Sequence, residues 1–198
     1  VDVPAPRVDR LSAMYQPKKT IYAKVTYADI AGLDKSSGRS GISGQLLNQL
    51  AQMDGFIEVV RVFENENVPH PHGSIDPARD IATMDGEFIL IDLIAAERRL
   101  EKLNEERRKG GGRDKAIIDR EIELFQRLHA ALSEETPLRD IDLTPEEEKT
   151  LSGFGLLSRK PLLIVLNLGE GQPAPSIEYN HRHSHVVPLQ AELEAQIA

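Results

Sequence analysis

The sequence predicts an α/β fold into which a helical hairpin is inserted. Two runs rich in β-branched or aliphatic residues, at 56–63 and 161–168, have the length and composition of buried strands. Between them lie two long stretches in which apolar residues recur every three or four positions, separated by a glycine-rich break at 109–113. Strands that alternate with helices indicate an α/β sheet, and two long helices joined by a few glycines indicate an antiparallel pair.

Local signals place the individual elements. In order, we expect a half-buried strand at 20–28, a helix at 46–53, a strand at 56–63, a polar loop at 64–79, a helix at 80–103, a helix from Asp114 to about Leu132, a helix beginning at Thr144, a fully buried strand at 161–168, a short strand at 185–189 and a closing helix at 190–198. Asp114 is a good N-cap, and Thr144-Pro145-Glu146-Glu147 carries the pattern of a capping box.

The two long helices have narrow apolar stripes, flanked by Glu, Lys and Arg, which favours coiled-coil packing. The second stripe consists of Ile118, Ile122, Phe125, Leu128 and Leu132. We therefore divide the chain into a partial α/β domain, 1–84 with 144–198, and an inserted helical hairpin, 85–143.

Composition narrows the classes of function. The chain has 198 residues, 24 Lys and Arg against 32 Asp and Glu, a net charge of −8 and no cysteine. The absence of cysteine excludes disulfides, thiolate metal sites and cysteine nucleophiles, and it fits a cytoplasmic protein. The negative charge disfavours nonspecific nucleic-acid binding, so no DNA partner is expected. No apolar run approaches the length of a membrane span, so no membrane partner is expected.

Asp29 directly follows the strand predicted at 20–28, and Gly32 follows three residues later. A carboxylate at a strand end followed by a glycine is how P-loop nucleotide hydrolases present an aspartate to a magnesium-bound phosphate. The other interpretation is an ordinary turn aspartate. The phosphate-binding pattern G-x-x-x-x-G-K-[ST] is not found in the sequence, which therefore predicts only part of a phosphate site.

Three histidines alternate near the end of the chain: His181, His183 and His185. On a strand they would share one face and could hold zinc or nickel. We favour the other interpretation, a polar surface loop leading into a strand, because the run contains no cysteine or carboxylate to complete a metal site.

Several short segments, in order along nearly the whole chain, carry a family resemblance. They are Val3-Pro4-Ala5-Pro6-Arg7-Val8-Asp9-Arg10-Leu11, Pro17-Lys18-Lys19, Asp29-Ile30-Ala31-Gly32-Leu33, Val60-Arg61-Val62-Phe63-Glu64, Asp76-Pro77-Ala78-Arg79-Asp80-Ile81, Asp92-Leu93-Ile94-Ala95-Ala96-Glu97-Arg98-Arg99-Leu100, Lys160-Pro161-Leu162 and Asn167-Leu168-Gly169-Glu170. With these segments the chain resembles the YchF branch of the Obg-like ATPases, within the P-loop GTPases. The resemblance implies an incomplete G-domain sheet. Its first strand and phosphate loop would precede Val1, and a TGS-type domain would follow. The hairpin falls where the family carries an inserted coiled coil.

The resemblance also implies roles for single residues. Asp29 would hold Mg²⁺ through water, and the Gly32 amide would sense the terminal phosphate. Leu33 stands at the usual glutamine position, and a leucine cannot orient water by hydrogen bonding. The remaining nucleotide-binding residues would be Asn167, Leu168 and Glu170 in the base-recognition motif, and Gln190 and Ala191 in the last nucleotide motif. For the base-recognition motif, the other interpretation is a polar turn after a strand.

By resemblance, the complete protein would hydrolyse ATP or GTP with Mg²⁺ in the cytoplasm, in association with the ribosome. Basic residues near 98–113 would contact the ribosome or ribosomal RNA, although interleaved acids also allow a plain solvated helix face. The alternative is a degenerate, non-catalytic G-domain paralogue that acts as a protein- or ribosome-binding module. We expect this chain alone to be inactive, and its sheet to be smaller and rearranged, or completed by another chain.

Overall fold

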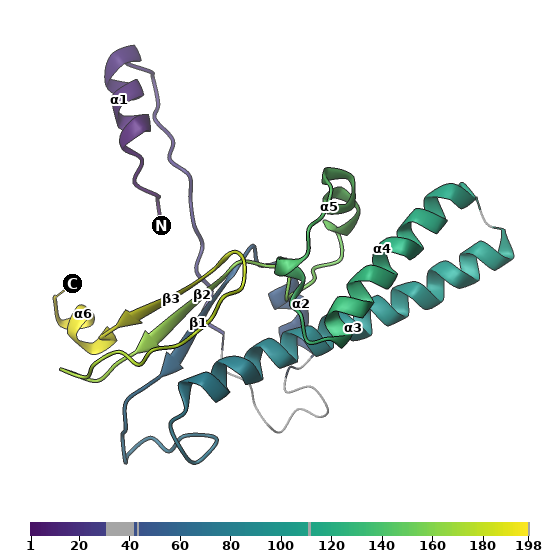
Figure 1. Ribbon diagram of the computed structural model, residues 1–198. Coiled ribbons are helices and arrows are strands. Elements are labelled where there is room, and N and C mark those ends of the chain that lie inside the picture. The colour runs from purple at the N-terminus through teal and green to yellow at the C-terminus, as the bar shows by residue number, and fades with distance from the viewer. Residues whose placement is uncertain (31–41, 43, 111, 198) are drawn as a thin grey trace. The chain divides into compact units, whose positions relative to one another are not determined.

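The computed structural model describes residues 1–30, 42, 44–110 and 112–197. The chain divides into two compact units, Val1–Leu33 and Asp34–Ala198, and each is described here by itself (Figure 1). Gly32 and Leu33, two of the predicted site residues, lie outside the described residues. No helix in the described ranges has both the length and the apolar character needed to cross a membrane.

The first unit is built around helix α1, Pro6–Tyr15, which has a proline in its first turn and ends at Gln16 in the left-handed region (φ 45°). The chain then returns so that residues 1–3 run antiparallel to 23–25, joined by a bridge between Asp2 and Lys24. None of the residues of α1 is buried.

The strand predicted at 20–28 is wrong. The described residues of this segment form a single bridge, and Ile21 and Tyr27 are 68% and 65% exposed. An alternating segment becomes a strand only where a neighbour takes its backbone hydrogen bonds along most of its length. Here backbone hydrogen bonds form only with the Ala23 carbonyl and with the amide and carbonyl of Val25, through Val1 and Val3.

The second unit contains a three-stranded parallel sheet in the order β1-β2-β3. Its strands are β1, Phe56–Arg61; β2, Leu162–Asn167; and β3, Ser184–Leu189. In its register Val59 lies opposite Val165, which lies opposite Val187. This confirms the α/β prediction, with the smaller sheet that was expected. Residues 161–168 are less uniformly buried than predicted, because buried and half-buried side chains alternate along β2.

Helix α3, Pro77–Lys109, connects the two parts of this unit. It begins at Asp76, whose side chain accepts a hydrogen bond from the Arg79 amide, and ends at Gly110 in the left-handed region. Its first half packs on the sheet: Ile81 joins the sheet core, and the rings of Phe88 and Phe56 lie 5.0 Å apart. The helix is longer than predicted because its Glu-, Lys- and Arg-rich end favours helix until the glycine.

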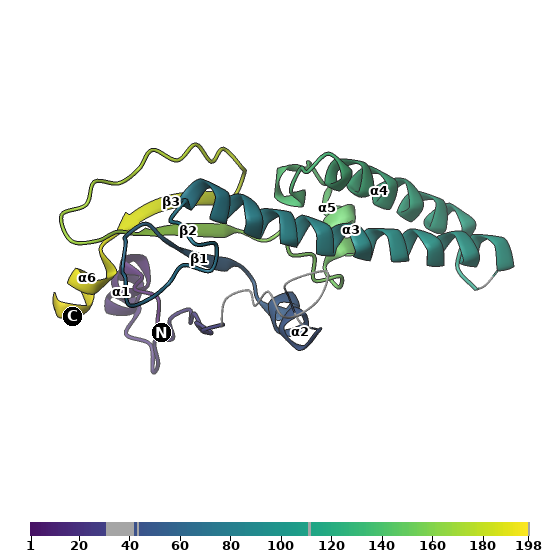
Figure 2. The same cartoon turned by 90° about the horizontal axis from the view of Figure 1, so that it is seen from below.

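The second half of α3 packs along α4, Lys115–Ser133, and the two helices lie side by side in both views (Figures 1 and 2). The whole predicted stripe of α4 is buried in this second core: Ile118, Ile122, Phe125, Leu128 and Leu132. Asp114 caps α4 through the Ala116 amide, as predicted. The two helices occupy the place predicted for the hairpin, while their coiled-coil packing stays a prediction.

Short elements complete the unit: α2, Gly44–Gln52; a 3-10 helix η1, Leu138–Asp140; α5, Pro145–Leu151; and α6, Ala191–Ile197. The capping box predicted for α5 is present. The Thr144 hydroxyl accepts from the Glu147 amide, and the Glu147 carboxylate accepts from the Thr144 amide.

A buried polar contact fixes α3 to the loop before β2. Asp92 of α3 is 1% exposed, and it accepts hydrogen bonds from the amides of Leu157 and Ser158 and from the Ser158 hydroxyl at 2.6–2.8 Å. Burial raises the pKa of Asp92 to about 6. The loop that leads into β2 is therefore held directly by the helix that reaches the second core.

Candidate functional site

The carboxyl ends of the three strands meet at one edge, where ligands bind in open parallel sheets. Backbone hydrogen bonds continue past the strands: the Val62 amide donates to the Asn167 carbonyl (2.9 Å), and the Leu168 amide donates to the Leu189 carbonyl (2.8 Å). The segment after each strand is therefore fixed to its neighbour. This brings two predicted motifs, at 167–170 and 190–191, to the same edge.

Asn167 makes the direct contact between these motifs. It is the last residue of β2, and its side-chain Oδ1 accepts from the Ala191 amide at 3.3 Å. The Gln190 carbonyl in turn accepts from the Glu194 amide inside α6. Two motifs are thus joined through one side chain, between residues 24 positions apart in the sequence.

Glu170 lies at the exposed corner of a tight turn that runs from Gly169 to Gln172. The Gln172 amide donates to the Gly169 carbonyl at 3.1 Å, and Gly171 supplies the left-handed conformation (φ 65°). Glu170 is therefore exposed to solvent three residues after Asn167, on a turn of defined shape.

The turn is attached to β1 by residues that the sequence analysis did not select. The Gln172 side chain accepts from the Gly169 amide (3.0 Å) and donates to the Val62 carbonyl (3.1 Å). A Cβ on Gly169 would lie 3.2 Å from Cβ of Phe63, so a larger residue there would have to displace Phe63 slightly. Nothing in the sequence pattern marked Gln172, because its partner Val62 lies 110 positions earlier.

Leu168 differs in character from its neighbours. Its side chain is 7% exposed and packs in the sheet core, and its amide is taken by Leu189. Of the predicted base-recognition residues, Asn167 and Glu170 therefore lie at the edge with polar groups, while Leu168 supports them from inside.

Asp29, the predicted metal ligand, belongs to the first unit. Its carboxylate is exposed, and no described residue forms an ion pair with it. One accessible carboxylate fits Mg²⁺, which keeps several waters and takes one or two carboxylates together with phosphate oxygens. Within the described ranges, no group of three or more His, Asp or Glu side chains could hold a metal ion.

The three alternating histidines do not share a strand face. His181 Nδ1 lies 2.6 Å from Asp140 Oδ2, His183 lies in a turn at φ 52°, and only His185 falls within β3. Since β3 begins at Ser184, the alternation argument for a zinc site does not hold, and the loop interpretation fits the structure.

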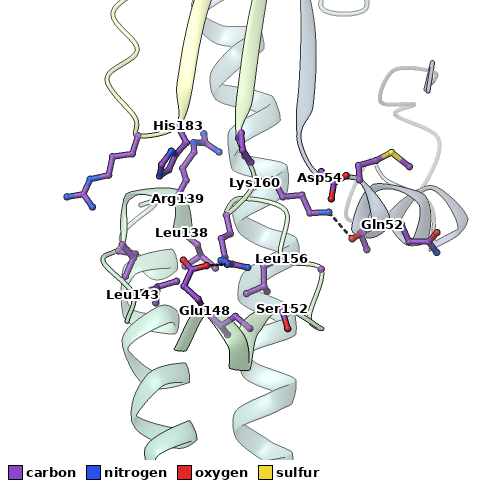
Figure 3. Close-up of a pocket in the computed structure, with 18 of the residues that line it drawn as sticks. Gln52, Asp54, Leu138, Arg139, Leu143, Glu148, Ser152, Leu156, Lys160 and His183 are labelled. Carbon is purple, nitrogen blue, oxygen red and sulfur yellow. Dashed lines mark hydrogen bonds and ion pairs between the residues drawn. The ribbon is translucent and has the colours of Figure 1, made fainter. Parts of the chain in front are cut away.

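A cavity of about 780 Å³ opens at the opposite edge, beside the amino ends of the strands (Figure 3). Lys160 crosses it and donates to the carbonyls of Leu50 and Ala51, at 2.7 and 2.8 Å, so it caps the end of α2. Arg159 and Glu148 form an ion pair there at 2.5 Å. Because its charged groups largely satisfy each other, this cavity is a structural junction rather than a prepared ligand site.

Many of the basic residues near the end of the helix pair are also paired internally. The ion pairs are Arg99–Glu121, Arg107–Asp119, Lys109–Glu105, Arg113–Glu106 and Arg113–Glu121. Arg98, Lys102 and Arg108 are exposed on α3. The positive field available to an anionic partner is therefore smaller than the count of basic residues suggests.

Known proteins resemble this chain along its whole length. No family model matches the chain. The ribosome-binding ATPase YchF of Bacillus subtilis (strain 168) is 31% identical over 209 residues, which include all of this chain and 56% of that protein. YchF of Escherichia coli O157:H7 is likewise 31% identical, over 206 residues, with the same coverage of both chains. The chain is a homologue of YchF.

Other YchF-related proteins extend the similarity. Obg-like ATPase 1 of Oryza sativa subsp. indica is 29% identical over 171 residues, which cover 86% of this chain and 43% of that protein. The solved structure of the Schizosaccharomyces pombe YchF GTPase superposes with a TM-score of 0.65 at 29% identity, covering 86% of this chain and 46% of the other. The resemblance drawn from the short segments is confirmed. The chain spans about half the length of the curated YchF relatives that it matches.

Proposed function

We propose that this chain supplies the base-recognition edge and the metal aspartate of a YchF-like nucleotidase that binds and hydrolyses ATP or GTP with Mg²⁺ and works with the ribosome. The observation that carries the proposal is the joined pair of motifs at the carboxyl edge, Asn167 bonded to Ala191 beside the turn that presents Glu170. A ribosomal partner would place this work in the cytoplasm.

The base-recognition chemistry follows from the residue types. In common GTPases an aspartate accepts from the two donors of guanine. Here that position carries Glu170, one methylene longer, and no lysine follows Asn167. Selection for guanine is therefore weakened, and adenine becomes an accepted base. Asn167 would have a mainly positioning role, since its Oδ1 is engaged by Ala191.

Asp29 would hold the hydrated Mg²⁺, which when bound neutralises phosphate charge. The Gly32 amide would report on the terminal phosphate, and Leu33 leaves the orientation of water to another group.

We further propose that residues 85–143 form an inserted coiled-coil arm on the partial G domain, 1–84 with 144–198. The arm would contact the ribosome or ribosomal RNA. Its exposed cations Arg98, Lys102 and Arg108 would make the contact, since most others are neutralised within the arm.

Calorimetric titration with ATP and GTP in the presence of Mg²⁺ tests the nucleotide proposal. Two polypeptides are compared: this chain, and the same chain joined at Val1 to the amino-terminal, phosphate-binding segment of a YchF relative. We expect the joined form to bind nucleotide, and its Asp29→Asn variant to bind without dependence on Mg²⁺. If the joined form binds no nucleotide, the nucleotidase proposal is wrong.

Recovery of ribosomal particles tests the arm. We expect a variant with residues 100–115 replaced by a short glycine linker to recover fewer particles than the intact chain. Equal recovery from both proteins would show that the arm does not contribute to ribosome binding. If particles are recovered but the joined form binds no nucleotide, the non-catalytic binding module is the better description.

A further inference from the structure

Glu170 is held at a fixed place by one side chain outside the recognised motif. The turn that carries it has a single backbone hydrogen bond of its own, from the Gln172 amide to the Gly169 carbonyl. The Gln172 side chain adds two more. It closes the turn on itself through the Gly169 amide, and it anchors the turn to the end of β1 through the Val62 carbonyl.

Val62 is the common anchor of both base-recognition groups. Its side chain is 8% exposed, its amide donates to the Asn167 carbonyl, and its carbonyl accepts from Gln172. The position of the Glu170 turn relative to Asn167 is therefore set through one buried peptide segment. The Gly169 backbone also lies close to Phe63, because a Cβ added at Gly169 would come within 3.2 Å of the Phe63 Cβ.

We propose that Gln172 is a positioning residue that determines how the chain discriminates between adenine and guanine. This inference rests on the proposed nucleotide function. Discrimination by a carboxylate depends on its placement against donors on the base edge, and small displacements weaken such hydrogen bonds steeply. A turn released from Val62 keeps Glu170 but no longer fixes its distance from Asn167. The residues proposed to act on the phosphates, Asp29 and Gly32, are far from this turn in the sequence, so we expect their contribution to be unchanged.

Hydrogen exchange on the 198-residue chain without ligand tests the anchor itself. Gln172→Met keeps the size of the side chain and removes both hydrogen bonds. We expect the Gly169 amide to exchange at least about threefold faster in this variant, because a typical hydrogen bond of this kind contributes that much protection. The exposed Gln126→Met on α4 is the matched control and should exchange as the wild type does. Unchanged exchange at Gly169 in Gln172→Met overturns the anchor.

Titration with ATP, GTP and inorganic triphosphate tests the role in discrimination, using the nucleotide-binding form described under the proposed function. In Gln172→Met the ratio of the ATP and GTP dissociation constants should move toward one by about three- to tenfold, while triphosphate affinity stays constant. Gln172→Glu keeps the acceptor for Gly169 but cannot donate to Val62, so it should behave like Gln172→Met.

The outcomes separate the two proposals. A wild-type form that binds no nucleotide contradicts the proposed function, and hydrogen exchange alone then decides whether Gln172 anchors the turn. Wild-type binding with an unchanged ratio in Gln172→Met contradicts only the role of Gln172 in discrimination. An equal loss of affinity for all three ligands would show that Gln172 acts on stability rather than on the base. A wild-type ratio in Gln172→Glu would show that Val62 is not the anchor.

Discussion

Glu58 carries a buried carboxyl group on the side of β1 that faces α3. Burial raises its pKa to about 8, the negative charge of Asp85 adds to the shift, and Arg139 opposes it. Its Oε2 has no hydrogen-bond partner among the described residues. Arg139 is already engaged with Asp85 at 2.5 Å and with Tyr179, so it does not neutralise Glu58. The folded protein therefore holds this proton at neutral pH.

Folding stability should consequently depend on pH through Glu58. Its pKa is higher in the folded than in the unfolded state, so its stabilising effect is complete below about pH 4.5 and is lost as pH rises toward about 8. Glu58→Gln should remove this pH dependence. Its free energy of unfolding should then rise relative to that of the wild type by up to about 1.4 kcal/mol for each pH unit over that range. Urea unfolding between pH 5 and pH 8 measures the difference. The exposed Glu66→Gln is the control, and curves that run parallel for wild type and Glu58→Gln would contradict the assignment.

At the scale of residues, the sequence predicted the groups whose partners are close along the chain. The Asp114 and Thr144 caps were predicted because an N-cap bonds an amide two or three residues away. Arg139 pairs with Asp85, 54 positions away, and Gln172 donates to Val62, 110 positions away, so no local pattern could reveal these contacts. The groups that shift the pKa of Glu58, such as Asp85 and Arg139, are likewise distant in the sequence. The proximity of Asn167 and Ala191 was predicted only through the family resemblance.

At the scale of elements, the register of α3 against α4 is fixed by a buried charged cluster. Glu121 of α4 is 7% exposed and accepts from Arg99 of α3 at 2.5 Å and from Arg113 at 3.0 Å. A longitudinal slip of one helix would separate these charges and leave Glu121 buried and unpaired, which is costly. The apolar stripe favours association of the helices, while this cluster selects one alignment.

Removing the central carboxylate should therefore destabilise the helix pair. We expect Glu121→Ala to lower the free energy of unfolding by about 2 kcal/mol, less than for a fully buried cluster because Arg113 is partly exposed. Glu123→Ala, exposed on the same helix, should change it by less than about 0.5 kcal/mol. Urea denaturation followed by circular dichroism compares them. Equal values for the two variants would show that the cluster does not set the register.

A second element-scale prediction concerns the end of α2. Gly155 has a φ of +60°, and a Cβ there would lie 2.8 Å from Cβ of Ala51 in α2. Gly155→Ala should lower the free energy of unfolding by at least about 1 kcal/mol, through backbone strain and displacement of α2. Gly153 has open space around it and no positive φ, so Gly153→Ala is the matched control. Thermal unfolding measures both, and a harmless Gly155→Ala would mean that α2 does not pack against this loop in solution.

At the scale of the whole molecule, one face of the parallel sheet carries exposed apolar side chains. Ile57, Val59 and Val187 are 49%, 65% and 42% exposed, and the register of Val59 with Val187 places them on the same side. Parallel sheets usually have both faces covered. We expect Val59→Lys to reduce self-association, measured by light scattering, with little change in unfolding free energy. A loss of more than about 1 kcal/mol would instead show that this face is packed against something in solution.

The elements that depend only on local sequence could be predicted. Those whose formation depends on pairing between distant segments could be predicted less well. The α4 stripe, β1, β2 and β3 were located correctly because the spacing of their apolar residues fits a single type of element, helix or strand. The segment 20–28 has the composition of a strand, yet strand formation depends on a partner that composition does not specify. The helix predicted at 80–103 already contains the residues of α3 that reach both cores, but its two apolar stripes did not indicate that they pack into two separate cores.

The length of α3 has a mechanical consequence. Its 33 residues correspond to a rod of about 50 Å, with one end seated on the sheet through Ile81 and the other reaching Lys109. A rod seated at one end acts as a lever: a tilt of about 5° at the sheet would displace the far end by about 4 Å, roughly three-quarters of a helical turn. Slight rearrangements around the strands would thus be magnified into displacements large enough for a bound partner to sense.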